Sequence, residues 1–150
     1  MSGIVETPVG RLGANSDGQA ITHLIWGRAG NLTEGPLATQ FVDEMTGYFA
    51  GERQDFTLPL APKGSAFQKD FYAALLAIPY GETRTYGDLA GDLGVSAQAI
   101  GQACGANPIA ILIPCHRVLA ANGLGGYSGE GGIESKVKLL RLEGAAGLLI

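Results

Sequence analysis

The sequence predicts an α/β part over residues 1–62 followed by a mainly helical part over residues 63–150. The first part holds short apolar runs at strand spacing and one helical pattern, whereas the second holds four helical patterns. Pro59, Pro62 and Gly64 indicate a linker between them, because proline and glycine interrupt regular elements. Hydrophobic residues make up 46% of the 150 residues and charged residues 16%, which is typical of one or two small globular domains.

Three strands are expected near the N-terminus. Ile4 and Val5 begin a first strand, and residues 7–12 contain a Pro-Val-Gly turn and a second strand. Residues 21–26 form a short apolar run that predicts a third strand.

A helix and a fourth strand are expected next. Apolar residues recur at helical spacing over residues 37–50, and Gly51 stands where a C-terminal cap would end that helix. Phe56, Leu58 and Leu60 then alternate with polar residues or proline, which predicts a strand before the linker.

The second part begins with an apolar stripe at helical spacing, made by Phe67, Phe71, Ala74, Leu75 and Ile78. The sequence Pro79-Tyr80-Gly81 is expected to end this helix. Thr85 is expected to cap a short helix that ends at Gly94, and Ser96 to cap a second over residues 97–104. Two short helices joined by a glycine-containing turn predict a helix-turn-helix.

The C-terminal segment predicts a loop and a closing helix. Six glycines between residues 120 and 132 oppose any regular element there. A closing helix that ends at Gly144 is expected from a stripe of Ile133, Val137, Leu140 and Leu142.

The residues with the strongest chemical signal are Pro114-Cys115-His116-Arg117-Val118. A cysteine is a nucleophile only as its thiolate, and a free thiol is mostly protonated at neutral pH. An imidazole directly beside the thiol favours ionisation, so this pair predicts Cys–His nucleophilic catalysis. The structural alternative, an inert buried thiol, is disfavoured by the adjacent histidine.

This segment resembles the active-site motif of the O6-alkylguanine-DNA alkyltransferases. Further segments match in order: residues 67–68, 78–83, 85–90, 107–108, 126–129 and 139–144. The resemblance implies a ribonuclease-H-like N-terminal fold without nuclease residues, and a winged helix-turn-helix in the C-terminal part. It also implies direct repair of DNA, in which the alkyl group on O6 of guanine moves irreversibly to the protein's own cysteine.

The resemblance implies a catalytic role for four residues. Cys115 would accept the alkyl group, His116 would help to deprotonate it, and Glu143 would orient and polarise His116. Asn107 would organise the turn that carries the motif.

The resemblance also implies contacts with DNA and guanine. Tyr86 would donate a hydrogen bond to the expelled guanine, and Ser128 would lie on the loop that faces O6. The backbone carbonyls of Cys115 and Val118 would accept from the exocyclic amine of guanine. Gln98 stands where members of the family commonly have an arginine that fills the gap left by the flipped base, so DNA affinity and flipping are expected to be weaker.

The expected partner is double-stranded DNA, bound in the minor groove without sequence preference, by a monomer that needs no cofactor and no metal. Ten basic residues against fourteen acidic ones give a net charge of −4, where DNA-binding domains are usually basic. Affinity for DNA should therefore be modest and strongly salt-dependent. The only two cysteines, the absence of a signal peptide and the lack of a membrane-spanning stretch predict a cytoplasmic location without membrane contact.

Two other functions stay open from the sequence. Alkyltransferase-like proteins bind the lesion without repairing it, but they lack the cysteine that stands here at position 115. A hydrolase or acyltransferase that uses Cys115 and His116 would turn over, whereas a thioether formed on Cys115 cannot be hydrolysed and permits a single turnover.

Overall fold

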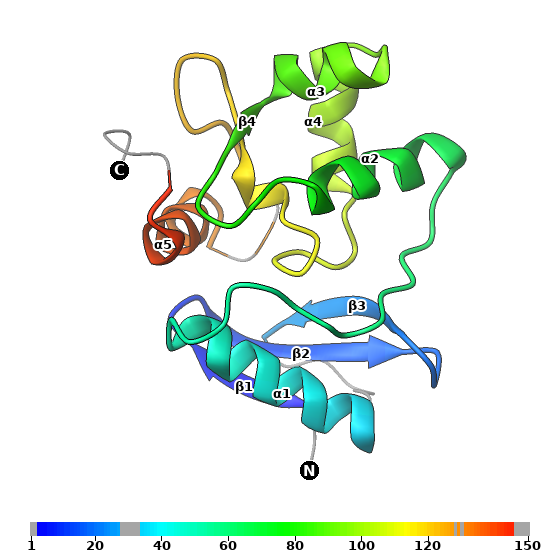
Figure 1. Cartoon of the computed structure of the whole chain (residues 1–150), viewed down its shortest axis with the longest axis vertical. Coiled ribbons are helices and arrows are strands. Elements are labelled where there is room, and N and C mark those ends of the chain that lie inside the picture. The colour runs from blue at the N-terminus through cyan, green and yellow to red at the C-terminus, as the bar shows by residue number, and fades with distance from the viewer. Residues whose placement is uncertain (1–2, 28–33, 128, 130, 146–150) are drawn as a thin grey trace. The chain divides into compact units, whose positions relative to one another are not determined.

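The structure, a computed structural model, describes residues 3–27, 34–127, 129 and 131–145. The chain forms two compact units, residues 1–63 and residues 64–150, and each is described by itself below (Figure 1). Within the described ranges, no helix is long and apolar enough to cross a membrane.

The first unit is an antiparallel sheet with a helix on it. Its strands β1 (Ile4–Thr7), β2 (Gly10–Ser16) and β3 (Ile21–Trp26) lie in sequence order. Helix α1 (Pro36–Phe49) lies across one face of the sheet (Figure 1). These elements confirm the predicted strands and helix, and the core lies between the layers; its fully buried side chains include Leu12, Ile21, Phe41, Met45 and Tyr48.

The strand expected over residues 56–60 is wrong. Only Leu60 pairs, in an isolated parallel bridge with Ile21. The backbone N–H groups of Thr57 and Leu58 instead donate to the carboxylate of Glu44, at 2.8 and 3.3 Å. Pro59 has no N–H to give a ladder, so the segment has too few free donors to continue as a strand.

The described part of the second unit contains four α-helices: α2 (Ala66–Leu76), α3 (Tyr86–Leu93), α4 (Ala97–Gly105) and α5 (Ile133–Glu143). Thr85 caps α3 in a reciprocal capping box with Asp88, and Ser96 caps α4 by accepting from the N–H of Ala99. Gly94, in the left-handed conformation at φ 68°, ends α3 and reverses the chain into α4. The helix pair predicted from these capping residues is confirmed.

A short parallel pair of strands was not predicted. Strand β4 (Arg84–Thr85) pairs with β5 (Val118–Leu119), which directly follows the 3₁₀ turn η1 (Cys115–Arg117). Because α3 begins immediately after β4, this pairing places the N-terminus of α3 beside the segment that carries the cysteine.

Helix α5 is present where it was expected, but its predicted stripe was only partly right, because Leu140 is fully buried and the other three residues of the stripe are not buried. Ile133 is 43% exposed. The buried face includes polar residues, and its members are Ser135, Lys136, Leu139, Leu140 and Glu143. The polar members of this face contribute to the site described below.

Candidate active site

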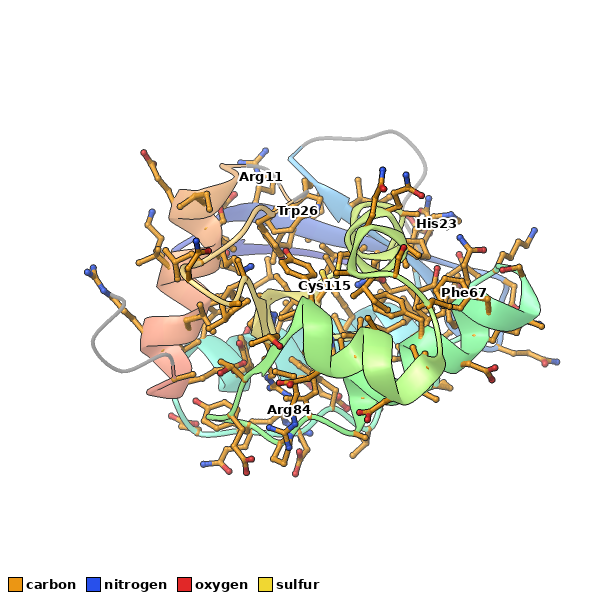
Figure 2. The ribbon with its side chains drawn as sticks, turned by 90° about the horizontal axis from the view of Figure 1, so that it is seen from above. Arg11, His23, Trp26, Phe67, Arg84 and Cys115 are labelled. Atoms are coloured by element: carbon orange, nitrogen blue, oxygen red, sulfur yellow. The ribbon has the colours of Figure 1, made fainter. Side chains whose placement is uncertain are left out.

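Cys115 begins the turn η1 and is only 4% exposed. Figure 2 shows it in the interior of the second unit, between α5 and the pair α3 and α4. Residues 111–119 are all buried, so the motif segment runs through the core rather than over the surface.

The turn before Cys115 is held by Asn107. Its Nδ2 donates to the carbonyl oxygen of Ile113 at 2.9 Å, and its Oδ1 accepts from the N–H of Ile109 at 3.0 Å. Between these points Ile111 has a φ of 74°, a conformation that is costly for a β-branched residue. The side chain of Asn107 therefore closes a loop that the backbone would not adopt unaided, and the chain leaves that loop at Cys115.

His116 is fully buried and is oriented by Glu143 from α5. The imidazole Nε2 lies 2.8 Å from Oε2 of Glu143. A carboxylate only accepts hydrogen bonds, so Nε2 carries the proton and Nδ1 is the bare nitrogen of the neutral ring. Among the described residues, no group hydrogen-bonds this Nδ1 atom. The ring thus presents an unused, buried proton acceptor next in sequence to the thiol.

Arg117 also binds Glu143. Its Nε donates to Oε1 at 2.8 Å and its Nη2 to Oε2 at 3.0 Å, which makes a forked ion pair. Its Nη1 donates to the carbonyl oxygen of Ile78 at 2.7 Å, and its guanidinium lies 5.8 Å from the ring centroid of Tyr80. The carboxylate of Glu143 therefore has both a histidine and an arginine as partners.

Burial dominates the acid–base behaviour of the cysteine and the histidine. It raises the pKa of Cys115, although a hydrogen bond from Asn107 and the charge of Lys136 oppose this shift. Burial lowers the pKa of His116, and Glu143 opposes that shift while Arg117 and Lys136 add to it. At rest, therefore, the pair is a thiol beside a neutral imidazole, and ionisation of Cys115 requires a proton acceptor.

Lys136 is a fully buried lysine that contacts the same region. Its Nζ donates to the carbonyl oxygens of Val118 at 2.6 Å and Gly126 at 3.0 Å. The ammonium also lies 5.9 Å from the ring centroid of Tyr86. Burial lowers its pKa to about 8, and the thiolate forms of Cys104 and Cys115 would act in the opposite direction. A cation is therefore held between the motif, the glycine-rich loop and Tyr86.

A cavity of about 410 Å³ lies beside these groups; its lining residues are Tyr86, Gly101, Cys104, Gly105, Gly126 and Tyr127. The volume is in the range of small-molecule sites. Burial raises the pKa of the Tyr86 hydroxyl, which also has a hydrogen bond with the backbone of Gly126. A thiolate at Cys115 would raise the pKa of Tyr86, Cys104 and Tyr127, so its sulfur lies within electrostatic range of three residues that line the cavity.

The structure brings most of the expected site residues together. Asn107 acts on Cys115, His116 binds Glu143, and Lys136 links Val118 to Tyr86; the backbone of residues 115–118 connects the three groups. Gln98 lies apart from them, exposed on α4. Ser128 lies outside the described residues.

Three residues of this region, Lys136, Arg117 and Cys104, were not among the site residues expected from the sequence. Lys136 precedes Leu140 and Glu143 by four and seven residues, which places all three on one helical face. That spacing could have indicated that Lys136 lies on the same side of the helix as Glu143. No comparable pattern in the sequence marks Cys104. Within the described part of the chain, no group of three or more histidine, cysteine or acidic residues could hold a metal ion.

Two family models match this chain. Residues 66–145 match the family model described as "6-O-methylguanine DNA methyltransferase, DNA binding domain". Residues 1–62 match "6-O-methylguanine DNA methyltransferase, ribonuclease-like domain". These two matches confirm the predicted fold class.

Individual relatives agree with the family models. The methylated-DNA–protein-cysteine methyltransferase of Mycobacterium tuberculosis is 42% identical over 93% of this chain and 89% of its own length. The enzyme of the same name from Methanosarcina acetivorans is 50% identical over 68% of this chain and 66% of its own length. The crystal structure of Mycobacterium tuberculosis OGT in complex with DNA superposes with a TM-score of 0.83, at 41% identity, over 93% of this chain and 90% of that one.

Proposed function

The chain belongs to the 6-O-methylguanine DNA methyltransferase family, and on this premise we propose that it repairs O6-alkylguanine in DNA by moving the alkyl group onto its own Cys115. The observation that carries the assignment to this cysteine is that Cys115 is buried next in sequence to His116, whose imidazole is hydrogen-bonded to Glu143 at Nε2 and bare at Nδ1. This arrangement supplies a proton acceptor for a thiol that burial otherwise keeps protonated.

The proposed reaction is a displacement at the alkyl carbon. The thiolate of Cys115 forms the new S–C bond while the C–O6 bond breaks, and its electron pair stays on the guanine. The proton that leaves Cys115 passes to Nδ1 of His116, either directly or through one water molecule. Glu143 stabilises the imidazolium that results, because its carboxylate already accepts from Nε2.

The guanine anion is a poor leaving group unless a proton or hydrogen bond reaches it as it departs. Tyr86 lines the cavity and is the proposed donor. Lys136, 5.9 Å from the Tyr86 ring centroid, would stabilise the phenolate that this donation leaves behind. The thiol thus gives its proton to His116, and the phenol gives its proton to the departing guanine.

The target base must leave the duplex to reach the cavity, at a cost of a few kcal/mol. Helix α4 is the proposed minor-groove element, and its exposed Gln98 would stand against the unpaired cytosine. The carbonyl oxygen of Val118 already accepts one hydrogen bond from Lys136. The exocyclic amine of guanine would therefore donate to the second lone pair of this oxygen. The carbonyl of Cys115 and the side chain of Ser128 complete the proposed contacts with the base.

The product is a thioether with no carbonyl for water to attack, so each protein molecule reacts once. Such an acceptor has to stay reduced until it meets a lesion. We therefore propose a cytoplasmic location and action as a monomer, and both described cysteines are free thiols.

The test is intact mass after incubation with a duplex that contains O6-methylguanine. Each protein molecule should gain one CH₂ unit, and the gain should stop at one equivalent. Cys115→Ala should abolish the gain while binding of the duplex persists. Turnover without an adduct would indicate the acyl-transfer alternative, and binding without a mass change would indicate a lesion-recognition protein; either result refutes the proposal.

A further inference from the structure

Arg117 is held by several contacts at once. It is 7% exposed, forks both oxygens of Glu143 and donates its third nitrogen to Ile78. Tyr80 lies against its guanidinium, and the Tyr80 hydroxyl donates to the carbonyl oxygen of Leu142 on α5. The guanidinium is thereby fixed on the carboxylate that also orients His116.

This placement decides which groups carry charge. His116 faces Glu143 and Lys136 from α5 and Arg117 from its own turn, and it directly follows Cys115 in the sequence. A buried carboxylate with only a histidine as partner draws a proton onto the imidazole, because an ion pair is less costly than one isolated charge. With Arg117 present, Glu143 is already neutralised, and a proton on His116 would leave a net positive charge in the core.

We infer that Arg117 is a positioning residue for alkyl transfer: by neutralising Glu143, it keeps His116 in the uncharged form whose bare Nδ1 can accept the proton of Cys115. The inference rests on the proposed function for its catalytic meaning. Its structural content, the protonation state of one imidazole, can be measured without any reaction.

The first measurement is nitrogen NMR of the unmodified protein between about pH 5 and 8, the range in which imidazoles usually titrate. The chain has only two histidines, so His116→Gln identifies the signals of His116, and those of His23 serve as a second imidazole in the same sample. His116 should keep a protonated Nε2 and a bare Nδ1 down to the acid end of this range. A doubly protonated His116 at neutral pH would overturn the inference.

The second measurement is the pH profile of the reaction with free O6-benzylguanine, which needs no DNA. In Arg117→Gln, the acid limb of the profile should move to higher pH by about one unit or more, the size expected when a charge neighbour is removed. Arg117→Lys keeps the charge but not the fork, so the acid limb should stay while the plateau rate falls about tenfold or more. Arg141→Gln, an exposed arginine on α5, is the matched control and should leave the profile unchanged.

A double-mutant cycle separates this role from a merely structural one. If Arg117 acts through Glu143, its replacement by Gln should shift the acid limb little once Glu143 is also Gln. An equal shift in both backgrounds, or an unshifted limb in folded Arg117→Gln, would refute the inference. If the wild-type protein fails to transfer any alkyl group, the proposed function fails, but the NMR result still decides the role of Arg117.

Discussion

The ammonium group of Lys136 lies 2.6 Å from the carbonyl oxygen of Val118, and both residues are fully buried. The same group donates to Gly126 at 3.0 Å and lies over the ring of Tyr86. One side chain from α5 therefore ties the end of the cysteine motif to the glycine-rich loop and to the phenol in the cavity.

Replacing Lys136 by Met should slow alkyl transfer to Cys115, since two carbonyl oxygens lose their donor and Tyr86 loses its nearby cation. We expect a fall of about tenfold to a hundredfold in the rate with O6-benzylguanine, as for other small misplacements in active sites. Lys138→Met removes a lysine from the exposed side of the same helix and should react at the wild-type rate. Equal rates for both variants would show that Lys136 has no part in the reaction.

Gly125 is needed because Tyr86 packs against it. Its φ is 70°, and a Cβ atom placed on it would lie 2.8 Å from the Tyr86 hydroxyl oxygen. Gly125→Ala should therefore displace the phenol and slow transfer by at least about tenfold. Gly123→Ala, in the same loop with open space around its Cβ position, is the control that should keep the wild-type rate. The measurement is the stopped-flow rate of each variant with O6-benzylguanine, and equal rates for the two variants would show that the contact of Gly125 with Tyr86 is not needed.

Glu44 should make the first unit sensitive to acid. Burial alone would raise the pKa of its carboxyl, but hydrogen bonds from Thr57, Gln40 and the backbone of Leu58 outweigh burial and lower it. Because the folded-state pKa is below the ordinary 4.5, the stabilisation is full above pH 4.5 and is lost as the pH falls through the folded value. Glu44→Gln should lower the free energy of unfolding by about 1–3 kcal/mol at neutral pH.

The unfolding of the first unit can be followed by the fluorescence of Trp26 in urea, because Trp26 is the only tryptophan and lies on β3. Glu52→Gln, which removes an exposed carboxylate, should change the stability by less than about 0.5 kcal/mol. The difference between wild type and Glu44→Gln should shrink as the pH falls below 4.5. A difference that is constant over this range would show that Glu44 is not the acid-sensitive group.

Gln98→Arg should speed the repair of duplex DNA without changing the chemistry. The exposed side chain on α4 would gain a positive charge, so binding should strengthen and its salt dependence should steepen by about one phosphate contact. The rate with free O6-benzylguanine should not change. Gln102→Arg adds the same charge one turn along the exposed part of α4, and an equal gain there would mean that charge alone, rather than position 98, is responsible.

The helices were predictable because their ends are local. Ser65, Thr85 and Ser96 cap α2, α3 and α4 with hydrogen bonds to residues three positions later, and Gly94 and Gly144 adopt left-handed conformations. Such signals lie within a few residues of the element they determine, so a single sequence contains them.

The errors concern buried polar groups with distant partners. Glu44 takes the N–H groups of residues 57 and 58 and prevents a strand there. Lys136 and Glu143 share the inner face of α5 with Leu140, the one member of the predicted apolar stripe that is buried. Periodicity identifies apolar faces only. A polar residue is buried only where a partner can hydrogen-bond it, and the spacing of residues within one element does not indicate where a distant partner lies.

The identity of the alkylated residue is the most direct test of the account. Cys104 lines the cavity and Cys115 lies close to it, and no lysine or arginine separates them in sequence, so trypsin leaves both in one peptide. Burial raises the pKa of Cys104 to about 12, and no imidazole adjoins it in sequence. After reaction with an O6-methylguanine duplex, fragment ions from this peptide should place the methyl group on Cys115 and leave Cys104 unmodified. A methyl group on Cys104, or no methyl group on the peptide when the duplex is demonstrably bound, would contradict the assignment of Cys115 as the alkyl acceptor.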